Sequence, residues 1–235
     1  MARTWRFALV SLVWSAPFSE QPEYFAMPLI DARWTRRSPN TEPFRWLATE
    51  PGELFPLDVA ERLADDFPKD GYARIDASAG GGGKSYRNYS KVLAGPDGAT
   101  ADLAGLPELW RRLVEEITGG DYRRDVARLL DQPVAPALEV RLARHANGDW
   151  LGPHTDRDDK LFSHIVYFNP GWRREWGGCL EILRGSDPGS VAATVVPVLG
   201  ASALLVRSDS SWHQVSTVAA DPVPERTSLL IHGIA

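Results

Sequence analysis

The chain has 235 residues, of which 43% are hydrophobic, which is the size and balance of one globular domain with a modest N-terminal extension. The formal net charge is −5 and no block of lysine and arginine occurs, so we expect no nucleic acid as the main partner. The single cysteine, Cys179, excludes an intrachain disulfide and a metal site built from several cysteines. We therefore expect a reducing, cytoplasmic compartment.

The first residues partly match a secretory signal. Arg3 and Arg6 precede the apolar run 7–14, but the run is short and no small-residue cleavage site follows it. We interpret residues 1–26 as an irregular extension, with a natural start near Met27 as the alternative. No apolar stretch approaches the roughly 20 residues that a membrane helix needs, so no membrane contact is expected.

Helical spacing of apolar residues appears after an irregular segment. Residues 1–55 are expected to form an extension with short strands, and residues 56–235 a single domain. Asp121 follows two glycines and is expected to cap a helix. Apolar stripes with start and stop signals predict three helices, over residues 57–67, 107–118 and 121–130.

A glycine-rich segment, residues 79–89, separates the first two predicted helices. It lacks the leading glycine of a phosphate-binding loop, because Ser78 stands there, and no apolar helix follows it. We interpret it as a mobile lid over the active site, with Lys84, Tyr86 or Arg87 contacting the substrate. A disordered surface loop is the alternative.

From Ala137 onward the apolar period changes to two, which is typical of strands. Short runs at this spacing favour an antiparallel sandwich or jelly roll, with the helices packed on the outside of one sheet. The fold class is therefore α+β and mainly β. The predicted strands cover residues 138–145, 162–169, 179–183, 191–197, 202–207, 213–219 and 226–232.

Two histidines and an aspartate in this half suggest a metal site. His154 and Asp156 alternate with Thr155, so in an extended backbone both side chains face the same way and can bind one ion. His213 opens a later predicted strand, from which it can reach the same place. Two imidazoles and one carboxylate form the facial triad expected of a non-haem Fe(II) site.

Arg226 and Ser228 lie two apart on the last predicted strand, so the guanidinium and the hydroxyl can hold one carboxylate together. An arginine directed into an apolar barrel needs an anionic partner, because its burial alone costs several kcal/mol. An arginine on the solvent face of the sheet, paired with a carboxylate, is the alternative.

In that order, His154-x-Asp156, His213 and Arg226-x-Ser228 resemble the Fe(II)- and 2-oxoglutarate-dependent dioxygenases, especially the prolyl-hydroxylase-like branch. The resemblance covers about residues 105–235 and leaves residues 1–100 only loosely matched. Where many members carry a tyrosine that helps to bind the cosubstrate, this chain has His145, whose imidazole can still donate a hydrogen bond. Connecting segments that also resemble the branch are His145-Ala-Asn-Gly148, Tyr167-Phe-Asn-Pro-Gly-Trp172 and Trp176-Gly-Gly-Cys-Leu-Glu181.

The resemblance implies a double-stranded β-helix, the jelly roll also found in cupins. It implies that His154, Asp156 and His213 bind Fe(II), that Arg226 and Ser228 bind the far carboxylate of 2-oxoglutarate, and that dioxygen is the co-reactant. Ascorbate is a candidate stimulant. Oxidative decarboxylation to succinate and carbon dioxide would then be coupled to attack on an unactivated carbon of the substrate.

The substrate is less closely specified. Glu139, Arg141 and His145 share one face of a predicted strand, so the first two can line the pocket and recognise the amine and carboxylate of an amino acid. A solvated or mutually paired Glu139 and Arg141 is the alternative. His164 and His232 are expected to be structural histidines.

Three functions remain open. The first is oxidation of a small molecule, an amino acid or an amino-acid-derived intermediate of natural-product biosynthesis, by hydroxylation, desaturation or a ring closure such as cyclopropane formation. The second is hydroxylation of a protein side chain or of a nucleic-acid alkyl group. The negative net charge of the chain disfavours the nucleic acid. The third is a cupin-like metal protein that does not use 2-oxoglutarate. The oligomeric state is left open, with a homodimer as one alternative.

Overall fold

The computed structural model describes residues 27–235 apart from 78–84, 98, 100, 102 and 222. The expectations for residues 1–26, for Lys84 and for most of the glycine-rich lid lie outside the described residues. The elements in chain order are η3 (Ala32–Arg36), β1 (Trp46–Thr49), α1 (Leu57–Asp65), β2 (Ala73–Ala77), β3 (Tyr86–Ala94), α2 (Glu108–Thr118), α3 (Gly120–Leu130), β4 (Ala137–His145), β5 (Trp150–His154), β6 (Lys160–Tyr167), η4 (Arg174–Trp176), β7 (Leu180–Leu183), β8 (Val191–Val195), β9 (Ser202–Val206), β10 (His213–Val215) and β11 (Arg226–Ile234).

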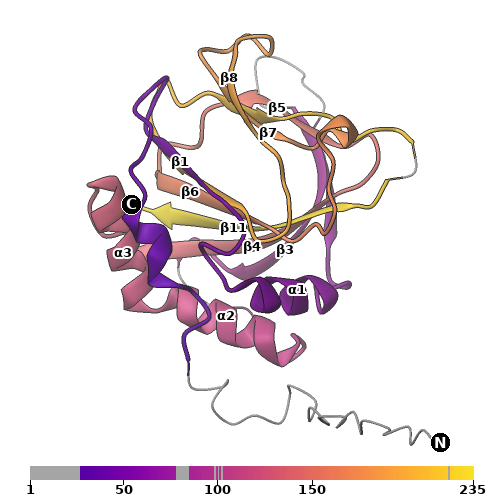
Figure 1. Cartoon of the computed structure of the whole chain (residues 1–235). Coiled ribbons are helices and arrows are strands. Elements are labelled where there is room, and N and C mark those ends of the chain that lie inside the picture. The colour runs from indigo at the N-terminus through magenta and orange to yellow at the C-terminus, as the bar shows by residue number, and fades with distance from the viewer. Residues whose placement is uncertain (1–26, 78–84, 98, 100, 102, 222) are drawn as a thin grey trace, which may run out of the picture.

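The strands form one sheet that curls into a nearly closed barrel (Figure 1). Its hydrogen-bonded order is β1-β9-β6-β11-β4-β3-β5-β10-β7-β8, with β2 added to β3, and each pairing among the described strands is antiparallel. The jelly-roll class expected from the sequence is confirmed. β3 pairs with both β4 and β5 and so joins the two walls of the barrel.

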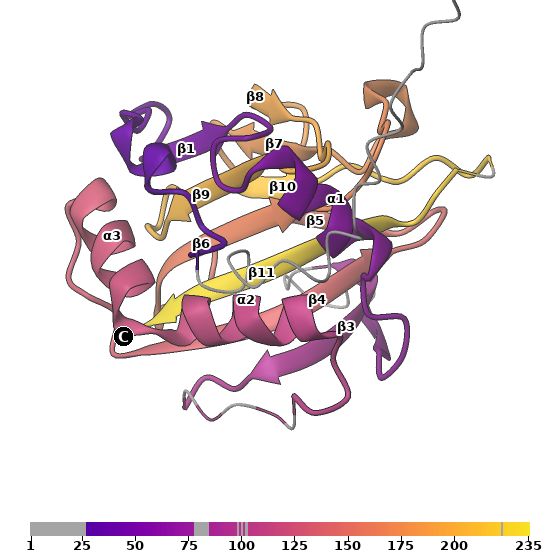
Figure 2. The same ribbon diagram turned by 60° about the horizontal axis from the view of Figure 1, so that its bottom comes forward.

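The helices pack outside the wall that contains β4 and β11, as Figure 2 shows for α2. Trp110, Leu113 and Ile117 lie on the inner stripe of α2 and are almost fully buried. They join one apolar cluster with Val140 and Leu142 from the outer face of β4. Because the helices cover this face, the opposite face of the same strands is left to line the interior of the barrel.

The structure corrects several predicted boundaries. Asp121 lies in the first turn of α3, and Gly119 is the N-cap residue, so the expected side-chain cap is wrong. The predicted strand at 213–219 ends at Val215. β2, β3 and β5 had no predicted counterpart. On β3 the inward-facing positions Asn88 and Ser90 are polar and hide the apolar alternation, and β2 and β5 are only five residues long each.

Within the described residues, none of the helices has the length and apolar composition needed to cross a lipid bilayer.

His164 is at the centre of a buried polar network that ties β6 to α3 and β9. Its Nδ1 lies 2.7 Å from the Tyr122 hydroxyl and its Nε2 lies 2.8 Å from Ser202 Oγ. Ser202 Oγ is in turn 2.8 Å from Thr49 Oγ1 on β1. These hydrogen bonds satisfy a histidine that is fully buried, which makes it the structural residue that the sequence predicted.

Burial lowers the pKa of His164 to about 3, so the native state keeps it neutral while the unfolded chain takes up a proton near pH 6.5. We therefore expect the free energy of unfolding to fall by about 1.4 kcal/mol for each pH unit below 6.5 on account of this residue. Urea denaturation of the wild type and of His164→Gln between pH 5 and 7.5 checks this. Equal pH slopes for the two proteins would contradict it.

Candidate active site

His154, Asp156 and His213 come together at the ends of two neighbouring strands. His154 closes β5, and its register partner across the sheet is His213, the first residue of β10. The two imidazole centroids are 4.2 Å apart, and His213 Nε2 lies 4.0 Å from Asp156 Oδ2. One ligand atom from each of the three residues lies within 4.8 Å of the others, and all three are buried.

Backbone carbonyl groups fix the tautomer of both histidines. His154 Nδ1 is 2.9 Å from the Gly152 carbonyl oxygen, and His213 Nδ1 is 2.9 Å from the Ser211 carbonyl oxygen. A carbonyl only accepts, so each Nδ1 carries the proton and each Nε2 keeps the lone pair that can bind a cation. This is the arrangement that a metal-binding histidine needs.

Asp156 is held as an ionised carboxylate. Lys160 Nζ donates to Oδ1 at 2.8 Å, and Ser163 Oγ donates to Oδ2 at 2.6 Å. Burial acts to raise the pKa of Asp156, but the neighbouring His213, Lys160 and His232, with the hydrogen bond from Lys160, outweigh it and hold the pKa well below its usual range. Two neutral imidazoles and one carboxylate fit a divalent iron with positions left open for other ligands.

Ser163 links Asp156 to His232. Because a carboxylate only accepts, the Ser163 hydroxyl proton goes to Asp156, and the His232 Nδ1–H donates to Ser163 Oγ over 2.7 Å. We expect Ser163→Ala to weaken Fe(II) binding by about 10- to 100-fold, because partners that orient a ligand have effects of that size. Anaerobic calorimetric titration measures this, with the exposed Ser210→Ala as the control. Unchanged affinity in Ser163→Ala would contradict the orienting role.

Arg226 lies on the inner face of β11 and is 1% exposed. Its Nε donates to the Gly178 carbonyl oxygen at 2.6 Å, its Nη1 lies 3.2 Å from Ser228 Oγ, and the guanidinium carbon stands 5.1 Å from the centre of the Tyr167 ring. No carboxylate of the described residues forms an ion pair with it. This arrangement contradicts the alternative of an arginine on the solvent face.

Two further polar groups beside Arg226 are buried without a hydrogen bond to any described residue: His145 Nε2 and the Tyr167 hydroxyl. His145 Nδ1 faces Arg226 Nη1 at 3.4 Å and must accept, so Nε2 carries the proton. Burial and the charge of Arg226 hold the pKa of His145 well below 6.5, which keeps it neutral. A buried cation and two unpaired polar groups fit a carboxylate such as the distal one of 2-oxoglutarate.

Tyr167 was not predicted as a site residue, although it opens one of the recognised segments. Ser228 pairs with Tyr167 on one side and with Ala143 on the other, so β6 brings a phenol to Arg226 from the opposite side to His145. The absence of a side chain at Gly178 lets Arg226 pack closely against its backbone, because a Cβ there would lie 3.0 Å from Arg226 Cδ. Tyr167 and His145 thus stand on β6 and β4, the two strands that flank β11 and its Arg226.

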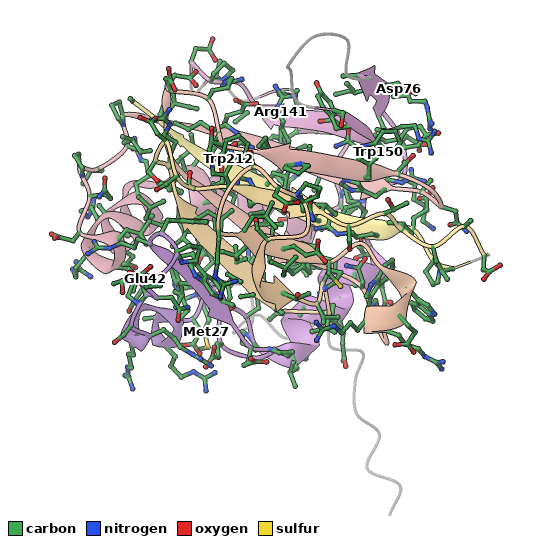
Figure 3. All side chains as sticks on the ribbon, turned by 90° about the horizontal axis from the view of Figure 1, so that it is seen from above. Met27, Glu42, Asp76, Arg141, Trp150 and Trp212 are labelled. Carbon is green, nitrogen blue, oxygen red and sulfur yellow. The ribbon has the colours of Figure 1, made fainter. Side chains whose placement is uncertain are left out.

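A cavity of about 270 Å³ connects the triad and Arg226. Three of the predicted substrate residues line it: Tyr86, Glu139 and Arg141, the last labelled on β4 in Figure 3. Arg87 does not line it, because its Nε donates to Asp149 Oδ1 at 2.8 Å and its guanidinium stacks on the Trp150 ring. Sequence reasoning also missed Arg157, Lys160 and Ser163, which line the same cavity.

Residues 140–232 match the model of the 2OG-Fe(II) oxygenase superfamily. Over 124 residues the chain is 25% identical to prolyl 3-hydroxylase OGFOD1 of Xenopus laevis, an alignment that covers 51% of this chain and 24% of the relative. The chain therefore spans about a quarter of that curated relative.

Solved structures share the fold at low sequence identity. A prolyl-4-hydroxylase of Pseudomonas putida superposes with a TM-score of 0.59 at 19% identity, covering 81% of this chain and 92% of that one. A Trichoplax adhaerens prolyl hydroxylase, in complex with a hypoxia inducible factor peptide fragment, gives 0.53 at 14% identity, with 80% and 83% covered. The α-ketoglutarate-dependent epimerase SnoN from nogalamycin biosynthesis gives 0.51 at 17% identity, with 87% and 82% covered.

Proposed function

We propose, from the match of residues 140–232 to the 2OG-Fe(II) oxygenase superfamily, that the chain is such an oxygenase and oxidises an unactivated C–H bond of a small molecule. The proposed substrate is an amino acid or an amino-acid-derived intermediate of natural-product biosynthesis. The observation that carries the proposal is the buried guanidinium of Arg226, which has no carboxylate partner among the described residues and lines the same cavity as the His154–Asp156–His213 triad. That burial also argues against a cupin-like protein that does without 2-oxoglutarate.

In this proposal each residue has a defined role. His154, Asp156 and His213 would hold Fe(II), and Arg226 with Ser228 would bind the distal carboxylate of 2-oxoglutarate. His145 Nε2–H would donate to that carboxylate from one side and the Tyr167 hydroxyl from the other. When bound, iron and 2-oxoglutarate supply oxidative decarboxylation by dioxygen, coupled to oxidation of the substrate. The protein orients the reactants and keeps bulk water from them.

The cavity supports a small substrate. Its volume of about 270 Å³, part of which 2-oxoglutarate would fill, lies just below the range of roughly 300–1,000 Å³ for small-molecule pockets, and charged side chains on β4 supply polar contacts. Hydroxylation is the simplest outcome, and desaturation or ring closure, including cyclopropane formation, draws on the same chemistry. The likeness in fold to an epimerase of nogalamycin biosynthesis is compatible with such variety.

Hydroxylation of a protein side chain is the second candidate. It is favoured by the sequence similarity to OGFOD1, whose name assigns it prolyl 3-hydroxylation. It is also favoured by the shared fold with a prolyl hydroxylase that was crystallised with a peptide fragment.

Succinate release separates the two candidates. We expect the Fe(II)-loaded protein to form succinate above its uncoupled rate when a free amino acid is added, with His154→Ala as the inactive control. Stimulation by proline-containing peptides alone would favour the protein substrate instead. Metal binding with no succinate under any condition would contradict both candidates.

A further inference from the structure

Three cationic side chains line one region of the cavity: Arg141, Arg157 and Lys160. Arg141 pairs with Leu230 in the register of β4 and β11, whereas Arg226 pairs with His145. Arg141 therefore meets the barrel through a part of β4 that lies away from the Arg226 end, and Arg157 and Lys160 approach from the turn after β5 and from the start of β6. The cluster is distinct from the groups that surround Arg226.

Glu139 holds two of these cations in place. It is 2% exposed, and Arg141 Nε donates to its Oε1 while Arg157 Nη2 donates to its Oε2 at 3.1 Å. Both carboxylate oxygens are thus engaged by guanidinium groups. The sequence suggested that Glu139 recognises a substrate amine, but with both oxygens engaged it is a poor acceptor for one. It is instead well placed to hold the two arginines.

The cations retain donors that the described residues do not use. Arg141 donates to Glu139 through Nε, and neither of its Nη nitrogens forms a hydrogen bond within the described part of the chain. Lys160 Nζ, 8% exposed as a side chain, donates one hydrogen bond, to Asp156 Oδ1. Three N–H groups are available on an ammonium, so it can serve another oxygen at the same time.

Charge balance indicates what these donors would bind. Two carboxylates of the described residues line the cavity, Glu139 and Asp156. The same described part of the chain contributes four cationic side chains to it: Arg141, Arg157, Lys160 and Arg226. A divalent cation at the triad would neutralise Asp156, and 2-oxoglutarate would balance Arg226. Of the described carboxylates that line the cavity, Glu139 would then be the one left to balance Arg141, Arg157 and Lys160. Arg157 is also paired with Asp159, which does not line the cavity. A partly buried excess of positive charge is stabilised when an anionic ligand enters.

We propose that Arg141 and Lys160, with Arg157 beside them, bind a carboxylate group of the substrate, and that Glu139 positions the two guanidiniums. This inference rests on the proposed function and narrows its substrate to an anion. The carboxylate of a free amino acid and a side-chain or terminal carboxylate of a peptide share this chemistry, and the experiment distinguishes them.

The test uses the full chain loaded anaerobically with Fe(II) and 2-oxoglutarate. The probes are the protein amino acids, their N-acetyl derivatives and small dicarboxylates, each paired with its own carboxamide, and peptides with free or amidated C-termini. Binding is read from the change in the visible charge-transfer band of the iron–keto acid complex. Absence of this band before any probe is added would mean that the proposed function has failed, and the inference with it.

With the band present, we expect at least one free carboxylate to bind about 10- to 100-fold more tightly than its amide, as for a charge-assisted hydrogen bond. Arg141→Met should remove that preference while the band without probe persists, and Arg141→Lys should keep part of it. Arg128→Met, an exposed change on α3, is the control and should behave as the wild type.

Equal binding of acids and amides would overturn the inference, as would a preference that survives Arg141→Met. Failure of each carboxylate in the panel to perturb the band would also overturn it. A preference confined to peptides would keep the carboxylate receptor and replace the small-molecule substrate by a peptide.

Discussion

Substitution of His154 by alanine is expected to weaken Fe(II) binding by more than about 100-fold and to reduce succinate formation to background. Loss of a residue that merely hydrogen-bonds to a metal ligand already lowers metal affinity by about 10- to 100-fold, and loss of a ligand itself should cost more. The triad offers three protein ligands, and loss of one leaves an imidazole and a carboxylate that bind iron weakly. Anaerobic calorimetry and succinate assay give the two quantities.

His154 is a sharper test than Asp156. Removing the carboxylate would leave Lys160 buried without its partner, at a cost of about 3–5 kcal/mol in stability that would obscure the loss of metal binding. Removing His154 leaves the Asp156–Lys160 pair in place. Circular dichroism of the metal-free variant controls for folding. Near-normal iron affinity and turnover in a folded His154→Ala protein would contradict the metal assignment.

Substitution of Arg226 by methionine is expected to raise the 2-oxoglutarate concentration needed for half-saturation by at least about 30-fold, because truncating one partner of a buried charge pair costs 2 kcal/mol or more. Iron binding should change little, since Arg226 is not a ligand of the triad. Titration of the visible band with 2-oxoglutarate, together with the KM for succinate formation, measures the effect.

Two controls separate binding from folding. The metal-free Arg226→Met protein should be as stable as the wild type or more so, because the wild-type guanidinium is buried without a carboxylate partner in the described structure. Arg226→Lys keeps the charge but lacks the planar fork of the guanidinium. Its affinity for 2-oxoglutarate should therefore lie between those of the wild type and of Arg226→Met. An unchanged KM in Arg226→Met would remove the assigned role of this residue.

The sequence predicted the parts of the site that depend on short-range spacing. His154 and Asp156 alternate on extended backbone, as do Arg226 and Ser228, and a period of two is visible without a structure. The same geometry explains one wrong grouping. Tyr86 and Arg87 are adjacent on β3, so only one of them can face the cavity, and Arg87 binds Asp149 instead.

Other parts depend on register between distant strands, which the sequence does not display. Lys160 is a separate case: it is only four residues from Asp156, but it begins an apolar strand and would ordinarily be solvated, and the local turn after β5 that directs it to Asp156 has no clear sequence signal. Tyr167 reaches Arg226 because β6 pairs with β11 in one particular register. β3 was missed for another reason, since its cavity-facing positions Asn88 and Ser90 are polar and do not show the apolar face of an ordinary strand.

Whether this barrel binds iron and 2-oxoglutarate together is decided by anaerobic titration of the Fe(II)-loaded protein with 2-oxoglutarate. We predict a weak visible charge-transfer band that saturates with one equivalent of cosubstrate, is absent in His154→Ala and needs much more 2-oxoglutarate in Arg226→Met. Failure of the band to form, with iron verified as bound, would contradict the assignment of Arg226 and the proposed activity.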